Sequence, residues 1–212
     1  MKTSISFLKS KYDLTETLKK LDETTTDYIH VDVMDGRFVD NEKLLNIDST
    51  VEVLKSVNKP LDIHLMCSYP LEYIEAFKVL KPSVITIHSE LVDLAEDYLN
   101  IIGSNNIKRG LGINPETKIS DIEYLLDKVD YCLIMGVHPG EGGQKLIPET
   151  LKKIDELKLL RKNRGYDYII SLDGGVNEET INLMSGLDVV VSGSFVCMND
   201  DYQKIINKIK EI

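Results

Sequence analysis

The sequence predicts an α/β fold, and more narrowly a closed (β/α)8 barrel of the TIM-barrel type. Eight short apolar runs alternate with eight longer amphipathic segments along the 212 residues, which is typical of a parallel sheet covered by helices. Eight such units in this length lie near the lower size limit of a closed barrel. Glycine-rich turns follow the late runs and not the first, which favours a barrel over an open doubly wound sheet.

Each expected strand is short and apolar, and several are bounded by Gly, Pro or Asn. The expected strands are Ser4–Leu8, Tyr28–Val33, Leu61–Leu65, Val84–His88, Lys108–Ile113, Tyr131–Met135, Tyr168–Leu172 and Val189–Ser192. The expected helices are Leu14–Leu21, Thr50–Val57, Leu71–Leu80, Leu91–Ile102, Ile119–Lys128, Thr150–Lys162, Glu178–Met184 and Tyr202–Ile212. Because no linker or change of composition divides the chain, we expect residues 1–212 to form one domain.

Composition narrows the classes of partner. The formal net charge is -10, and no cluster of basic residues interleaved with aromatics occurs, so nucleic acid is not an expected partner. Three widely spaced cysteines argue against a disulfide framework. The N-terminus lacks a signal-peptide pattern, and no apolar run approaches the ~18 residues that a membrane-spanning helix needs. We therefore expect a cytoplasmic protein that does not bind membranes.

Four ionisable residues lie at or near the C-terminal ends of apolar strands. They are His30, Asp32, His64 and Asp173. In a barrel these strand ends meet on one face, and burying such groups costs several kcal/mol unless a partner offsets the cost. Two imidazoles and two carboxylates suit zinc, iron, manganese or cobalt better than calcium. The alternative is that these side chains only satisfy each other in the core.

Glycines and methionines line the same predicted face. Gly140, Gly142 and Gly143 follow the sixth strand, Gly174 and Gly175 the seventh, and Gly193 with Ser194 the eighth. Such turns allow backbone N–H groups to approach a phosphate, although each could simply be a tight turn. Met34, Met66 and Met135 end their strands and are core or pocket lining. His88 is expected to be a hydrogen-bonded strand-end histidine and not a ligand, and His138 to lie in an exposed loop.

Six ordered runs resemble the ribulose-phosphate 3-epimerase family. They are His30-Val-Asp-Val-Met-Asp-Gly, His64-Leu-Met, Asn114-Pro-Glu-Thr, Met135-Gly-Val-His-Pro-Gly-Glu-Gly-Gly-Gln, Asp173-Gly-Gly-Val and Ser192-Gly-Ser. The resemblance implies a (β/α)8 barrel that interconverts D-ribulose 5-phosphate and D-xylulose 5-phosphate with one divalent metal. It also implies a sugar phosphate as the partner molecule and, since barrels often self-associate, a homo-oligomer of unspecified size.

The resemblance gives roles to individual residues. His30, Asp32, His64 and Asp173 correspond to the metal ligands, and Asp32 and Asp173 also to the paired acid and base. Inversion at C3 needs a proton carrier on each face of the sugar, and the metal would stabilise the enediolate between the two steps. The phosphate would be held by Gly142, Gly143, Gly175, Gly193 and Ser194, with Gly174 as turn support.

Lys9 departs from the family pattern. The family usually has a serine at this position, whereas this chain reads Ser6-Phe-Leu-Lys9, and Ser10 could replace that serine through a one-residue slip. The lysine could pair with a carboxylate, bind a substrate oxygen or disfavour the metal. Arg37, where histidine is common, also departs.

These departures leave two alternatives open. One is a 3-epimerase of a hexulose phosphate such as allulose 6-phosphate, and another is a non-catalytic phosphate-binding barrel. A barrel resembling orotidine-phosphate decarboxylase is disfavoured because the run from Asp32 to Asp35 has no lysine.

Overall fold

Eight parallel strands close into a barrel in the order of the chain, β1-β2-β3-β4-β5-β6-β7-β8. This computed structural model describes residues 1–41 and 47–212. The strands are β1 (Lys2–Ser6), β2 (Tyr28–Met34), β3 (Leu61–Met66), β4 (Val84–His88), β5 (Lys108–Ile113), β6 (Tyr131–Met135), β7 (Ile169–Asp173) and β8 (Val189–Ser192). The predicted (β/α)8 barrel is confirmed.

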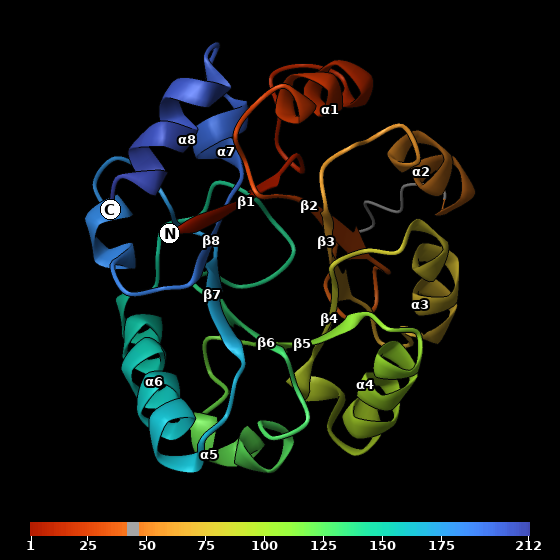
Figure 1. The fold of residues 1–212 in the computed structure, drawn as a ribbon, viewed down its shortest axis with the longest axis vertical. Coiled ribbons are helices and arrows are strands. Elements are labelled where there is room, and N and C mark those ends of the chain that lie inside the picture. Colours follow the sequence, from red (N-terminus) through yellow and green to blue (C-terminus); the bar gives the residue numbers. More distant parts are fainter. Residues whose placement is uncertain (42–46) are drawn as a thin grey trace.

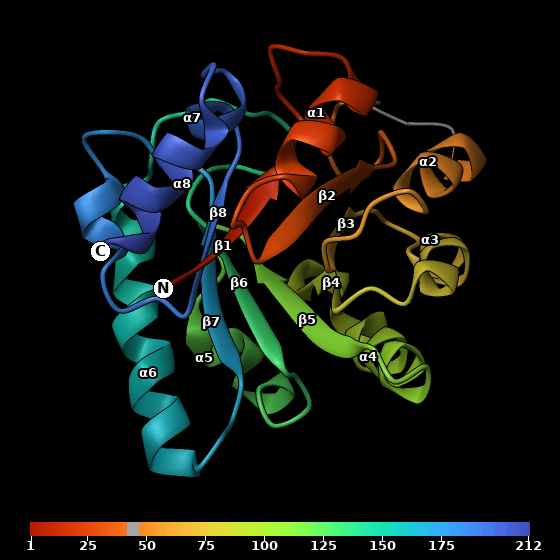
Figure 2. The same cartoon turned by 45° about the horizontal axis from the view of Figure 1, so that its top comes forward.

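The first and last strands close the barrel. β1 pairs in parallel with β8 from Lys2 opposite Val189 to Ile5 opposite Ser192, and Figure 2 shows these two strands side by side. A closed sheet has no free edge, so every strand has hydrogen-bonding neighbours on both sides. The two labelled chain ends lie near each other on one flank (Figure 1).

Helices surround the ring of strands (Figure 1). In the described ranges the α-helices are α1 (Leu14–Asp22), α2 (Ile47–Leu54), α3 (Leu71–Phe77), α4 (Ala95–Ser104), α5 (Ile119–Ile122), α6 (Lys152–Arg164), α7 (Ser194–Cys197) and α8 (Tyr202–Lys210). The 3-10 helices are η1 (Lys78–Leu80), η2 (Ser89–Leu94), η3 (Glu123–Leu125), η4 (Pro148–Leu151) and η5 (Ile181–Met184).

Several predicted elements differ from the structure. The helix predicted over Ile119–Lys128 is the four-residue α5 followed by the 3-10 turn η3. β1 ends at Ser6 and not at Leu8, so Lys9 belongs to the loop that leads to α1. The helix predicted over Glu178–Met184 is only the 3-10 turn η5. The Asn177 side chain accepts from the backbone N–H groups that follow it, and Gly186 at φ 90° ends the segment, so too few residues remain for an α-helix.

Alternation along the strands separates two environments. In β2, Ile29, Val31 and Val33 pack into the large apolar core between strands and helices, while His30 faces the barrel interior. A separate apolar cluster that includes Leu133 fills the interior. The interior also holds buried polar side chains, among them Ser4, Asp62, Thr86 and Ser171.

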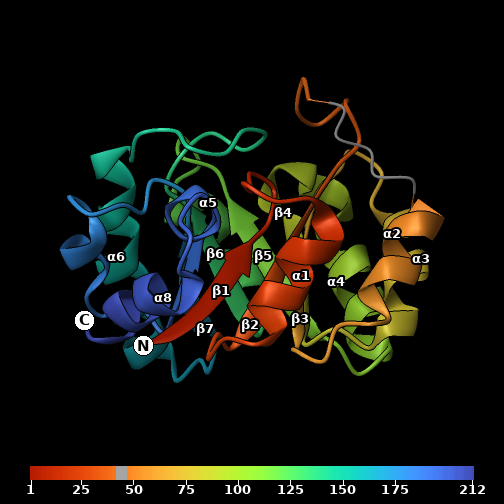
Figure 3. The same cartoon turned by 90° about the horizontal axis from the view of Figure 1, so that it is seen from above.

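Loops from opposite sides of the ring meet over this end. Figure 3 shows the loop after β2 and the loop after β6 rising from the same end of the barrel, away from the labelled N-terminus. The Asn41 side chain donates to the Gly140 carbonyl at 2.7 Å, and Val39 packs against Gly140. These contacts join the two loops at the C-terminal end of the barrel.

No helix in the described ranges is both long and apolar enough to cross a bilayer. The homo-oligomer stays a prediction.

Candidate active site

Strand register brings the predicted residues to one end of the barrel. β2 pairs with β3 so that Asp32 lies opposite His64. β6 pairs with β7 so that Met135 lies opposite Asp173. His30 precedes Asp32 by two residues and therefore shares its face of the strand. This is the C-terminal end of the barrel, where enzymes of this fold carry their active sites.

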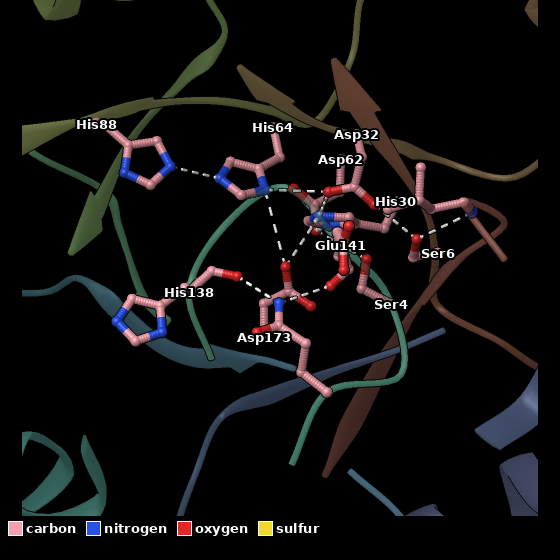
Figure 4. Close-up of polar contacts among 12 residues, drawn as sticks. Ser4, Ser6, His30, Asp32, Asp62, His64, His88, His138, Glu141 and Asp173 are labelled. Atoms are coloured by element: carbon pink, nitrogen blue, oxygen red, sulfur yellow. Dashed lines mark hydrogen bonds and ion pairs between the residues drawn. The ribbon is translucent and has the colours of Figure 1, made fainter. Parts of the chain in front are cut away.

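The four predicted ionisable residues form one cluster. His30, Asp32, His64 and Asp173 each offer one ligand atom, and these atoms all lie within 4.8 Å of one another. Asp32 Oδ1 lies 3.3 Å from His30 Nε2 and 3.2 Å from His64 Nδ1. Asp173 Oδ2 lies 3.8 Å from each of these nitrogens. Both imidazoles are fully buried, whereas Asp173 keeps 16% of its side chain exposed, so the cluster reaches solvent at Asp173. Figure 4 shows how the four side chains lie.

Buried polar side chains hydrogen-bond to His30 and to Asp32. Asp62, in β3, accepts from His30 Nδ1 at 2.8 Å and from the Ser4 hydroxyl at 2.7 Å. The Ser6 hydroxyl donates to Asp32 Oδ2 at 2.6 Å. With Nδ1 engaged by Asp62, the other ring nitrogen of His30 faces the cluster, and this buried Nε2 has no aligned hydrogen-bond partner among the described residues.

Electrostatic interactions shift the pKa values of the two carboxyl groups in the cluster in opposite directions. Burial opposes ionisation of Asp32, but the charges and hydrogen bonds of His30 and His64 outweigh it and lower the Asp32 pKa. Burial raises the pKa of Asp173, and the nearby Asp32 and Asp62 carboxylates reinforce this against the opposing charge of His30. For His30 itself, burial disfavours the charge, yet Asp62 and Asp32 raise its pKa well above the usual range. These interactions favour the ionised form of Asp32 and the protonated form of Asp173.

The two remaining histidines behave as the sequence indicated. His88 is hydrogen-bonded at the end of β4, with its Nε2 2.8 Å from His64 Nε2 and its Nδ1 3.1 Å from Glu90 Oε2. Figure 4 shows this ring on the far side of His64 from the carboxylates. His138 is 61% exposed and pairs with Glu116.

A pocket runs from the cluster to the glycine turns. Asp32 and Asp173 line one end of it, and Ser6 lines it as well. The predicted binding residues all line this pocket: Lys9, Met34, Met66, Met135, Gly140, Gly142, Gly143, Gly174, Gly175, Gly193 and Ser194. The pocket therefore has the ionisable cluster at one end and the glycine turns at the other, and the methionines form its apolar lining.

Backbone geometry explains two of these glycines. Gly175 has φ 74°, and a Cβ there would meet the Leu146 backbone nitrogen at 2.8 Å. Gly143 has φ 81°, and a Cβ there would lie 3.0 Å from Lys9 Nζ and 3.7 Å from the Ser194 hydroxyl. Any larger residue would strain the backbone and fill this end of the pocket.

Lys9 faces the glycine turns. Its amino group lies against Gly143, and among the residues that the structure describes it forms no ion pair with Asp32 or Asp173. The alternative that Ser10 takes the place of the serine is wrong, because its hydroxyl bonds Thr17 and Tyr202 instead. β1 ends at Ser6, so the chain leaves the sheet before either residue.

Three polar residues at the site were not predicted. Ser6 bonds Asp32, Asp62 bonds His30, and Glu90 bonds His88. Asp62 lies two residues before His64 in the same strand, so strand alternation alone places both on one face. Glu90 lies beyond the end of β4, where periodicity gives no direction.

Arg37 lies outside the pocket. Its guanidinium carbon is 5.9 Å from the centre of the exposed Tyr69 ring, and it does not line the pocket among the described residues. Of the two basic residues that depart from the family pattern, only Lys9 can meet a ligand there.

Comparison with known proteins gives a consistent result. The model of the "Ribulose-phosphate 3 epimerase family" matches residues 2–197. The ribulose-phosphate 3-epimerase of Bacillus subtilis (strain 168) is 37% identical over 197 residues, covering 91% of this chain and 90% of its own length. The ribulose-phosphate 3-epimerase of Escherichia coli (strain K12) is 36% identical over 191 residues, covering 87% and 83%.

Solved structures of more distant proteins share the fold. KGPDC from Streptococcus mutans superposes with a TM-score of 0.72 at 14% identity, covering 99% of this chain and 95% of its own. Identity this low supports the barrel fold alone.

Proposed function

The chain belongs to the ribulose-phosphate 3-epimerase family, and from this premise we propose that it inverts C3 of D-ribulose 5-phosphate to give D-xylulose 5-phosphate. The reaction takes place beside His30, Asp32, His64 and Asp173, four side chains that would hold one divalent metal.

The convergence of the four ligand atoms carries the proposal. Two ring nitrogens and two carboxylate oxygens lie within 4.8 Å of one another, and His30 Nε2 is buried without an aligned hydrogen bond. Such a set of acceptors repels itself unless a cation or protons lie between them. The donor chemistry fits zinc, iron, manganese or cobalt. When bound, the metal would supply positive charge that stabilises negative charge developing on the sugar oxygens.

Asp32 and Asp173 are proposed as the two proton carriers. They come from β2 and β7, which are not neighbours in the barrel, so each can serve a different face of a substrate lying between them. The Asp32 pKa is lowered and the Asp173 pKa is raised. Asp32, which favours the ionised form, can accept the C3 proton from one face, and Asp173, which favours the protonated form, can return a proton to the other. In the reverse reaction the two roles exchange.

The rest of the pocket orients the substrate. Backbone N–H groups at the glycine turns bind the phosphate, namely those of Gly142, Gly143, Gly175, Gly193 and Ser194, while Gly140 and Gly174 shape the turns. The Lys9 ammonium approaches the phosphate beside Gly143. The three methionines keep water from the carbon that loses its proton.

The proposal is tested by the exchange of hydrogen at C3. Ribulose 5-phosphate is incubated with the protein in deuterated buffer, first as purified, then after chelation, and then with single metals added back. We expect deuterium at C3 together with epimer formation, loss of both after chelation, and recovery with at least one of the four metals. Epimerisation that survives complete removal of metal would contradict the metal centre.

Two variants test the carboxylates. D32N and D173N should each lower kcat by at least a hundredfold, because a general acid or base contributes about 10²–10⁴-fold. D155N changes an exposed aspartate of α6 and should behave as the wild type. Full turnover in D32N or D173N would contradict the two-carrier mechanism. Allulose 6-phosphate in the same assay tests the hexulose alternative, which predicts the higher kcat/KM for that sugar.

A further inference from the structure

A buried histidine, His88, and a partly exposed glutamate, Glu90, lie beside His64 and have no role in the mechanism above. His88 places its Nε2 2.8 Å from His64 Nε2, and the Nδ1 of the same ring lies 3.1 Å from Glu90 Oε2. The three groups form a line that ends at the cluster, because His64 Nδ1 lies 3.2 Å from Asp32 Oδ1. Figure 4 shows the His88 and His64 part of this line.

Donors fix the state of the Glu90 carboxylate. Its Oε1 accepts from the Asn114 backbone N–H at 3.1 Å and from the Ser89 hydroxyl at 3.1 Å. The Thr117 hydroxyl donates to the same oxygen. Three donors on one oxygen favour the ionised carboxylate, which can only accept. The contact between Oε2 and His88 Nδ1 is therefore a hydrogen bond in which Nδ1 carries the proton.

The proton on Nδ1 decides which nitrogen of the neutral His88 ring donates a hydrogen bond and which accepts one. When Nδ1 of a neutral imidazole carries the proton, Nε2 has the lone pair and accepts. His64 Nε2 must then donate across the 2.8 Å contact. The same rule leaves His64 Nδ1 with its lone pair, directed at the space shared with Asp32 and Asp173. Asp32 Oδ1, 3.2 Å from this nitrogen, is an acceptor that favours the opposite tautomer. Asp32 Oδ1 also has His30 Nε2 at 3.3 Å, whereas Glu90 Oε2 has His88 as its one donor among the described residues, so the Glu90 end sets the tautomer.

Packing prevents His88 from turning over. The ring is completely buried, and its centre lies 4.6 Å from the centre of the Phe38 ring. A Cβ on Gly112 would lie 3.2 Å from His88 Cε1 and Nε2, so a side chain there would press against the ring. The rings of His64 and His88 are stacked, with an interplanar angle of 28°.

We propose that Glu90 and His88 are positioning residues that hold His64 in the tautomer whose Nδ1 lone pair faces the cluster. The proposal deepens the proposed function, since that lone pair is the one a divalent metal would use. Outer partners of metal-binding histidines commonly act in this way. Here the outer partner is a second histidine, His88. The Glu90 carboxylate sets the tautomer of His88, which in turn sets the tautomer of His64.

Glu90→Gln should reverse the direction of the hydrogen bonds between residue 90, His88 and His64 with almost no change in side-chain shape. The three donors keep the amide oxygen at their side, so the new NH2 group faces His88 Nδ1 and donates to it. His88 Nε2 then carries the proton and donates to His64 Nε2. His64 Nδ1 becomes protonated, directs its N–H at Asp32 and Asp173, and no longer offers a lone pair to a metal.

The tautomers are read by long-range proton–nitrogen NMR of the metal-free protein labelled in histidine. The chain has four histidines, and the spectrum of H64N identifies the signals of His64. We expect wild-type His64 to be protonated at Nε2 and the E90Q protein to be protonated at Nδ1. Zinc affinity, measured by competition with a chelator, should fall about 10–100-fold in E90Q.

E116Q is the matched control, because Glu116 also bonds a histidine, His138, but in an exposed loop. It should change neither the His64 tautomer nor the zinc affinity. A wild-type His64 protonated at Nδ1, or an unchanged His64 tautomer in E90Q, overturns the inference. A wild-type protein that binds no divalent metal overturns the proposed function instead, while the tautomer comparison still decides the inference.

Discussion

Lys9 gives the glycine-rich end of the pocket a positive charge in a chain whose formal net charge is -10. An acidic protein repels an anionic substrate at long range, so local groups must offset that repulsion. The Lys9 amino group lies at Gly143, with the Ser194 hydroxyl close by. It is thus placed to meet a phosphate and not the ionisable cluster.

Lys9→Ser should weaken the binding of the phosphate end of the substrate. We expect KM for ribulose 5-phosphate to rise about tenfold, which corresponds to about 1.4 kcal/mol, with kcat nearly unchanged because Lys9 does not contact the reacting carbon. The difference should shrink at high salt, since Lys9 is exposed and its charge is screened.

Lys11→Ser is the control for a general change of charge. Lys11 pairs with Asp200 and does not line the pocket, so this variant should keep the wild-type KM. Equal KM values for the two variants, or a fall in kcat alone for Lys9→Ser, would argue against a phosphate contact.

The turn after β7 shows how an element sets the shape of the pocket. Gly175 has φ 74° and lies against the backbone of Leu146. Gly165, which ends α6, has a similar φ of 70°, yet a Cβ there would meet nothing within 4 Å. The pair therefore separates the cost of the left-handed backbone from the cost of close packing.

Gly165→Ala should cost about 1 kcal/mol, because only the backbone preference is lost. Gly175→Ala should cost about 3 kcal/mol, because the methyl group also forces the Leu146 backbone to move. Urea unfolding of both variants measures the two costs. Equal losses of stability would contradict the close approach at Gly175.

The stability of the whole metal-free protein should fall as the pH is lowered through two overlapping windows. Burial lowers the pKa of His88 to about 4, although Glu90 opposes this. Burial of Glu90 acts to raise its pKa, but hydrogen bonds from His88 and Thr117 outweigh this and lower it to about 2. In both cases the unfolded chain binds protons more readily than the folded one, so protons favour unfolding.

The windows follow from the ordinary pKa of each group, 6.5 for His88 and 4.5 for Glu90. His88 should cost stability between pH 6.5 and about 4, and Glu90 between pH 4.5 and about 2, each on the order of 3 kcal/mol. Urea unfolding across this range measures the loss. E90Q should flatten the lower window, and an unchanged pH slope in E90Q would contradict the role of Glu90.

Local patterns carried the prediction of the barrel and of its ligand cluster. His30 and Asp32 share a face of β2 because strand side chains alternate, and parallel strands end on one face of the barrel, which adds His64 and Asp173. Both inferences need only the period of a strand and the direction of its chain. Where the pattern was weak, it failed: polar Lys2 and Thr3 hid the start of β1, and the run from Glu178 had too few residues for a helix.

The sequence by itself thus determined the barrel, the strand faces and the residue types at the C-terminal ends, because each depends on short-range periodicity and on the direction of parallel strands. Only the tertiary structure decided which polar groups support those residues. Asp62 behind His30, Glu90 behind His88 and Lys9 at Gly143 are contacts between separate segments. Their geometry is set by strand register and loop packing across the closed barrel, which no local pattern encodes.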